Sequence, residues 1–63
     1  MTTSKNYTVR ELRRFLLDGN FTCIINGILY FSEDTRELLK NLENQNQLLE
    51  VKETGILQLT FNI

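Results

Sequence analysis

The sequence predicts an α+β fold with the element order α-β-β-α-β-β, in which two helices accompany one four-stranded, largely antiparallel sheet. Three observations predict it: a helix-capping pattern at Thr8, an Asn26-Gly27 pair between two apolar runs, and alternating apolar and polar residues near the C-terminus. We expect residues 1–63 to form one small domain, with residues 1–6 as a polar N-terminal lead.

The first helix is predicted from its N-terminal signal. Thr8 is a good N-cap, and Glu11, three residues further on, completes a capping box. One helical face then carries the apolar residues Val9, Leu12, Phe15 and Leu16. Gly19 suits the left-handed position that often ends a helix. We therefore expect a helix from Val9 to Leu17.

A hairpin follows this helix. Phe21–Ile25 and Ile28–Phe31 are rich in β-branched and aromatic residues, and Asn-Gly between them is typical of a type I′ turn. Such a turn determines the register of the two strands. It places Ile25 opposite Ile28, Ile24 opposite Leu29, Cys23 opposite Tyr30 and Thr22 opposite Phe31.

The second helix is expected to begin at Ser32 or Asp34, either of which is a plausible N-cap, and to end near Asn44. Glu33, Asp34 and Glu37 near its N-terminus complement the helix dipole. Its apolar stripe consists of Leu38, Leu39 and Leu42.

A second hairpin closes the predicted fold, with strands Leu48–Lys52 and Ile56–Ile63. A three-residue loop, Glu53–Gly55, sets Val51 opposite Leu57 and keeps apolar residues on one face. It also requires a left-handed Gly55. The end of the last strand runs past its hairpin partner, so its neighbour is either the first hairpin or a second copy of the chain.

Size and composition limit how this domain is stabilised. A domain of about 60 residues buries only about 60% of the surface of its unfolded chain, so disulfides, a metal or a second copy often help. Cys23 is the only cysteine and histidine is absent, which excludes an internal disulfide and disfavours a zinc site. We expect no metal and no cofactor, and the hypothesis that remains for added stability is a homodimer.

The composition also bears on location and class. The N-terminus is polar, no apolar run is long enough to span a bilayer, and the one thiol suits a reducing compartment. We therefore expect a cytoplasmic protein without a membrane segment. Seven asparagines among 63 residues suggest an AT-rich coding genome, such as that of a phage, another mobile element or a low-GC bacterium.

No catalytic constellation is recognisable. Without histidine, Cys23 lacks the usual base, and its mid-strand position predicts a buried thiol. The acids at the start of the second helix are explained by the helix dipole. We expect a protein that is not an enzyme and has no catalytic residues.

Basic residues gather on the first helix. Arg10, Arg13 and Arg14 stand at helical positions i, i+3 and i+4, with Lys5 just upstream. Such a cluster can bind phosphates, but we favour a solvated helix face, in which Glu11 and Arg14 stand three residues apart. The net charge of −1 is also unlike that of a dedicated nucleic-acid binder. A small DNA- or RNA-binding regulator that uses these four residues is the alternative hypothesis.

The first hairpin is apolar on both faces, which is the main functional clue. Either helices pack on both of its sides or one face meets another chain. Free cysteine is usually buried, so we expect Cys23, with Ile25, Ile28 and Tyr30, to face the core. Ile24, Leu29 and Phe31 then face a partner. The leading hypothesis is a non-enzymatic protein-binding module, a regulator, inhibitor or adaptor, that contacts a second copy or a different protein.

A short segment resembles a known family. Residues 7–13 (YTVRELR), followed by Ile25-Asn26-Gly27, are similar to the N-terminal half of prevent-host-death antitoxins. Those proteins have a strand before the first helix and a mostly helical C-terminal part, whereas a polar lead and a terminal hairpin are expected here. We therefore assign no family on this resemblance.

Overall fold

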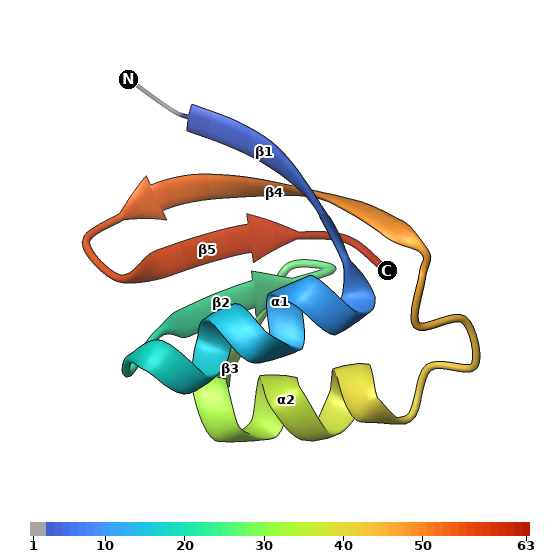
Figure 1. Ribbon diagram of the computed structural model, residues 1–63. Coiled ribbons are helices and arrows are strands. Elements are labelled where there is room, and N and C mark those ends of the chain that lie inside the picture. Colours follow the sequence, from blue (N-terminus) through green and yellow to red (C-terminus); the bar gives the residue numbers. More distant parts are fainter. Residues whose placement is uncertain (1–2) are drawn as a thin grey trace.

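The computed structural model describes residues 3–63 and has an α+β fold with two α-helices (Figure 1). Its sheet has five strands and is mixed, where the sequence predicted four strands and a largely antiparallel sheet. A short 3-10 helix, η1, extends the first α-helix. The elements are β1 (Thr3–Thr8), α1 (Val9–Phe15), η1 (Leu16–Asp18), β2 (Thr22–Ile25), β3 (Ile28–Phe31), α2 (Ser32–Lys40), β4 (Leu48–Gly55) and β5 (Gln58–Phe61).

The strand order is β1-β4-β5-β2-β3, so β1 and β3 are the two edges of the sheet. All neighbouring strands are antiparallel except β2 and β5, which run parallel. The final strand therefore finds its second neighbour in the first hairpin of the same chain. The overhang of the last strand is explained within one molecule and gives no support to a dimer.

The additional strand is β1, which the sequence indicated only as a polar lead. Met1 and Thr2 lie outside the described residues, and Thr3–Thr8 pairs with β4, with Tyr7 opposite Leu49. Its sequence, TSKNYT, includes the strand-favouring residues Thr3, Tyr7 and Thr8 but lacks the alternation of apolar and polar residues that predicts a strand. Pairing with β4 rather than intrinsic propensity makes this segment extended. Tyr7 then stacks on Phe15 of α1, with ring centroids 5.6 Å apart.

The predicted start of α1 is confirmed and its predicted end is partly wrong. The Thr8 hydroxyl accepts a hydrogen bond from the Glu11 amide at 3.1 Å, and the Glu11 carboxylate accepts one from the Thr8 amide at 2.9 Å. Instead of continuing to Leu17, the α-helix tightens after Phe15 into η1. Gly19 has a φ of −177°, which is extended backbone and not the predicted left-handed conformation.

The Asn26-Gly27 hairpin and its register are confirmed. Asn26 has a φ of 52° and Gly27 a φ of 83°, the two positive angles of a type I′ turn. The four predicted cross-strand pairs are those of the structure.

Helix α2 begins directly after β3, without the predicted cap. Its N-cap is Phe31, which has no side chain able to cap, so neither Ser32 nor Asp34 has that role. Instead, the Thr35 hydroxyl donates to the Phe31 carbonyl oxygen at 3.0 Å. The helix ends at Lys40, four residues before the predicted end at Asn44.

The predicted loop of the second hairpin is wrong. Strand β4 continues to Gly55, which lies opposite Gln58, and Leu57 rather than Gly55 has a positive φ, of 52°. An irregularity between Glu53 and Gly55 shifts the register, so Val51 does not face Leu57. With this irregularity, the apolar residues of the two strands still point to the same face of the sheet. The buried residues are Leu49, Val51, Leu59 and Phe61, as predicted for a shared face. Leu57 and Ile63, which were predicted on the same face, are exposed.

The core lies between the sheet and the two α-helices, which cover the same face of the sheet (Figure 1). From the helices, Val9, Leu12, Leu16 and Leu39 are buried against it. Cys23 and Ile25 of β2 meet them from the sheet. The opposite face of the sheet, called the open face below, carries no helix among residues 3–63.

Candidate interaction surface

The open face carries an apolar patch at one end, formed by Ile24, Leu29 and Phe31, which is called the β3 patch below. Side chains alternate across a strand, so these residues point away from the face that holds Cys23 and Ile25. Ile24 is partly buried, whereas Leu29 and Phe31 expose 58% and 63% of their surface. The structure thus brings the three predicted partner-binding residues together on the surface.

Of the residues expected to face the core, one departs from the expectation. Cys23 and Ile25 are fully buried and Tyr30 packs against the core, but Ile28 is 59% exposed. Ile28 lies on the helix side of the sheet at the turn end of the outermost strand, beyond the buried cluster. Ile28 therefore adds to the apolar surface at the β3 edge, and the sequence did not predict that it would be exposed.

The backbone of β2 shows in which direction each of its amides points. The N–H groups of Thr22 and Asn26 donate to the carbonyl oxygens of Leu57, at 2.9 Å, and Phe61, at 3.1 Å, on the β5 side. Amides at even-numbered positions of β2 therefore point at β5. Those at odd-numbered positions point at β3, because alternate residues of a strand direct their hydrogen-bonding groups to opposite sides.

This alternation determines which groups of β3 lie on the free edge. Ile28 and Tyr30 stand opposite the odd-numbered β2 residues and form the hydrogen bonds of the hairpin. Leu29 and Phe31 direct their backbone groups outward, where the described chain has no further strand. Because the Phe31 carbonyl accepts from Thr35, the N–H and C=O of Leu29 and the N–H of Phe31 are the groups offered for pairing.

The two edges of the sheet differ in chemistry. Strand β1 is composed of polar residues apart from Tyr7, and it includes Lys5, the kind of residue that protects an edge from pairing with another chain. Strand β3, with the sequence ILYF, has no charged residue and exposes three large apolar side chains. Only the β3 edge has the properties of an interaction edge.

The four basic residues come from two elements and differ in their contacts. Lys5 lies on β1, opposite Val51. Arg10 and Arg13 donate from Nη1 to the side-chain oxygens of Asn46, at 3.2 Å, and Gln45, at 2.7 Å. These two arginines hold the loop between α2 and β4 against α1. Arg14 is exposed on α1.

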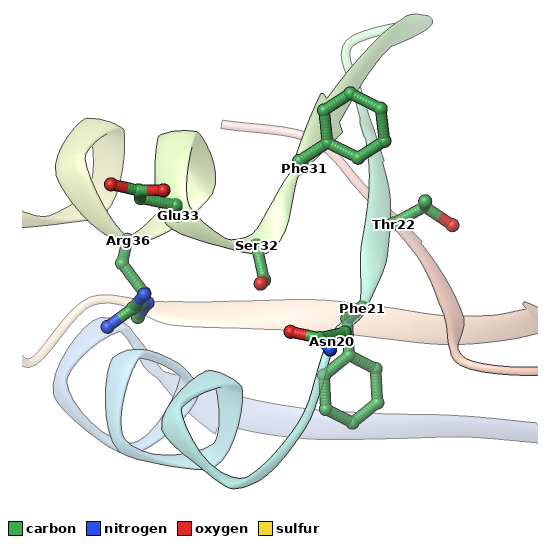
Figure 2. Close-up of a pocket in the computed structure, with 7 residues that line it drawn as sticks. All are labelled: Asn20, Phe21, Thr22, Phe31, Ser32, Glu33 and Arg36. Carbon is green, nitrogen blue, oxygen red and sulfur yellow. The ribbon is translucent and has the colours of Figure 1, made fainter.

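An open pocket of about 420 Å³ lies where β3 passes into α2 (Figure 2). Phe31 and Phe21 lie on opposite sides of it, with Ser32 between them. Arg36 lines it with an Nε that is buried and has no hydrogen-bond partner in the described chain, and Glu33 supplies a charge of the opposite sign. The pocket thus has one positive and one negative side chain, so its charge favours neither an anionic nor a cationic ligand. Its lining residues are Asn20, Phe21, Thr22, Phe31, Ser32, Glu33 and Arg36.

The Cys23 thiol is buried in the core. Burial raises the pKa of the Cys23 thiol, which keeps it protonated, although a hydrogen bond with Thr35 opposes this effect. Residues 3–63 contain no group of three or more histidine, cysteine, aspartate or glutamate side chains placed to hold a metal ion.

In the same residues, no helix has the length and apolar character needed to cross a membrane.

Comparison with family models, with curated proteins and with solved structures finds no match. The presence of β1 removes one of the two differences from the prevent-host-death antitoxins, but the terminal hairpin remains. The functional argument therefore rests on the β3 patch and the free edge beside it.

Proposed function

We propose that this chain is a small non-enzymatic protein-binding module, a regulator, inhibitor or adaptor, and that the β3 patch is its contact surface. The observation that carries the proposal is the combination of exposed Leu29 and Phe31 side chains with unpaired backbone groups of the same two residues. Clustered apolar side chains on a small domain are typical of interaction sites. An open edge strand adds backbone hydrogen bonds to such a contact.

The nucleic-acid alternative has less support. Arg10 and Arg13 each use one of five guanidinium donors to hold the loop between α2 and β4, which gives both side chains a structural role, and the net charge of −1 is unlike that of a dedicated nucleic-acid binder. Lys5 comes from a strand rather than from the basic helix face. Arg14 alone does not make a phosphate-binding surface.

The test compares two substitutions of equal chemistry at different places. Leu29→Lys puts a charge into the β3 patch, and Leu17→Lys puts one on η1, where the leucine is 65% exposed. The tagged chain would be used to capture proteins from the organism that encodes it, after circular dichroism has shown that both variants fold. We expect wild type and Leu17→Lys to retain the same partner and Leu29→Lys to lose it. Equal capture by all three proteins would contradict the proposed surface.

A further inference from the structure

We propose that the β3 edge pairs with the β3 edge of a second copy, giving a twofold dimer with one continuous ten-stranded sheet. This inference rests on the proposed function and names the occupant of the surface. The two β3 strands run antiparallel, as a twofold axis perpendicular to the sheet requires.

The free backbone groups determine the register of the pair. The backbone groups of Leu29 and Phe31 face outward. If the twofold axis passes beside Tyr30, Leu29 lies opposite the partner's Phe31, and Phe31 lies opposite the partner's Leu29. The Phe31 N–H then donates to the partner's Leu29 carbonyl oxygen, and symmetry repeats this bond. Both bonds use groups that have no other backbone partner in residues 3–63.

The same register is favourable for the side chains. On the open face, Leu29 lies opposite Phe31 of the partner subunit, so that each apolar side chain meets another. On the helix side, Tyr30 lies beside the partner's Tyr30, a pair of rings with no charge. Since β3 contains no charged residue, no like charges oppose each other along the strand. The edge is therefore self-complementary.

The opposite edge of the sheet explains why assembly ends at two copies. Pairing β3 of one copy with β1 of the next is a head-to-tail contact, which does not close and leads to fibres. Strand β1 exposes Thr3, Ser4, Lys5 and Asn6, and it offers little apolar area to such a contact. The β3–β3 contact uses both apolar edges and leaves only polar ones outside.

The available area predicts a weak dimer. Ile28, Leu29 and Phe31 are exposed to between 58% and 63%. Because an aromatic side chain buries roughly 150–250 Å² when fully covered, these three contribute on the order of 300 Å² per copy. A standard interface buries about 800 Å² per partner. We therefore expect a dissociation constant in the micromolar range.

Amide hydrogen exchange on the wild-type chain tests the proposal without any substitution. Spectra would be compared at roughly 5 µM and roughly 500 µM, which bracket a micromolar dissociation constant. We expect the Phe31 amide, which donates to the partner's Leu29 carbonyl oxygen, to exchange more slowly at the higher concentration. Ile28 and Tyr30, which are paired within the hairpin, and the β1 amides serve as controls and should not change. A concentration-independent rate at Phe31 would overturn the proposal.

Sedimentation equilibrium supplies the second measurement. We expect wild type and Leu17→Lys to form dimers at high micromolar concentration, and Leu29→Lys to remain a monomer. A monomeric wild type, or a dimeric Leu29→Lys, would overturn the twofold pairing. If Leu29→Lys fails to fold, the exchange data on wild type still decide. A monomeric wild type that captures a different protein through Leu29 would remove the dimer and leave the proposed function intact. A dimer that Leu29→Lys dissociates, with no different protein captured, would support the β3 patch as a contact surface with the second copy as its partner.

Discussion

The side chain of Asn26 is joined to the backbone of Ile63 by two hydrogen bonds. Its Nδ2 donates to the Ile63 carbonyl oxygen at 3.3 Å, and its Oδ1 accepts from the Ile63 amide at 2.9 Å. The backbone N–H of Asn26 also donates to Phe61 at 3.1 Å. The residue that forms the β2–β3 turn therefore also fastens the end of β5, and it supports the parallel β2–β5 pairing at the centre of the sheet.

We expect Asn26→Gly to separate these two roles. Glycine adopts the positive φ of the turn readily, so the hairpin should persist, but both side-chain bonds to Ile63 are lost. The free energy of unfolding should fall by about 1–2 kcal/mol, from these bonds and the greater freedom of glycine in the unfolded chain. Urea denaturation measures this loss, and exchange of the Ile63 amide reports the bond itself.

Asn26→Asp is the matched control, because it keeps the Oδ1 acceptor and lacks the Nδ2 donor. The Ile63 amide should stay protected in this variant and become exposed to exchange in Asn26→Gly. If exchange at Ile63 is the same in all three proteins, the contact does not persist in solution.

Local signals were sufficient to predict most elements of the fold. The Thr8 capping box and the Asn26-Gly27 turn each act within a few residues, so the start of α1 and the register of the first hairpin followed from the sequence. Strand β1 and the β2–β5 pairing depend on contacts between segments far apart in the chain. Strand β1 was therefore not predicted, and for the last strand the sequence left open whether its second neighbour is the first hairpin or a second copy.

The candidate surface was likewise predictable where it depends on local signals, and not where it depends on contacts between distant segments. Strand alternation and the burial expected of Cys23 placed Ile24, Leu29 and Phe31 on one face. That β3 is an edge strand, and that Ile28 is exposed beside it, depends on the strand order, which the pattern does not contain. The pocket at Arg36 likewise requires the β3–α2 junction to meet the segment before β2. Sequence reasoning therefore predicted the face but not the edge.

The Glu11 carboxylate should make stability depend on pH. Its pKa is lowered from the ordinary value of 4.5, first by the hydrogen bond from the Thr8 backbone amide and then by the Thr8 hydroxyl. A group whose pKa is lower in the folded state stabilises the fold above its unfolded pKa, and this contribution is lost as the pH falls through the folded value. Wild type should therefore lose more stability than Glu11→Gln between about pH 7 and about pH 3.

Glu11→Gln is a suitable comparison because glutamine also serves at this position of a capping box. Urea denaturation at several pH values gives the difference in unfolding free energy between the two proteins. That difference should shrink as the solution is acidified. A difference that stays constant with pH would show that the Thr8–Glu11 pair does not titrate as the structure indicates.

The stability changes caused by Gly27→Ala and Gly55→Ala distinguish the backbone conformations of the two hairpin turns. At Gly27, where φ is 83°, alanine meets no atom within 4 Å but must adopt a left-handed backbone, so Gly27→Ala should cost about 1–2 kcal/mol. Gly55 does not have a positive φ, and an added Cβ would approach only the movable Gln58 side chain, with Oε1 at 2.6 Å. Because alanine has less freedom than glycine in the unfolded chain, Gly55→Ala should be neutral or stabilising by up to about 1 kcal/mol. Thermal and urea denaturation of both variants provide the measurement. A loss at Gly55 as large as that at Gly27 would instead support a left-handed Gly55 and the three-residue loop, in conflict with the register in which Gly55 faces Gln58.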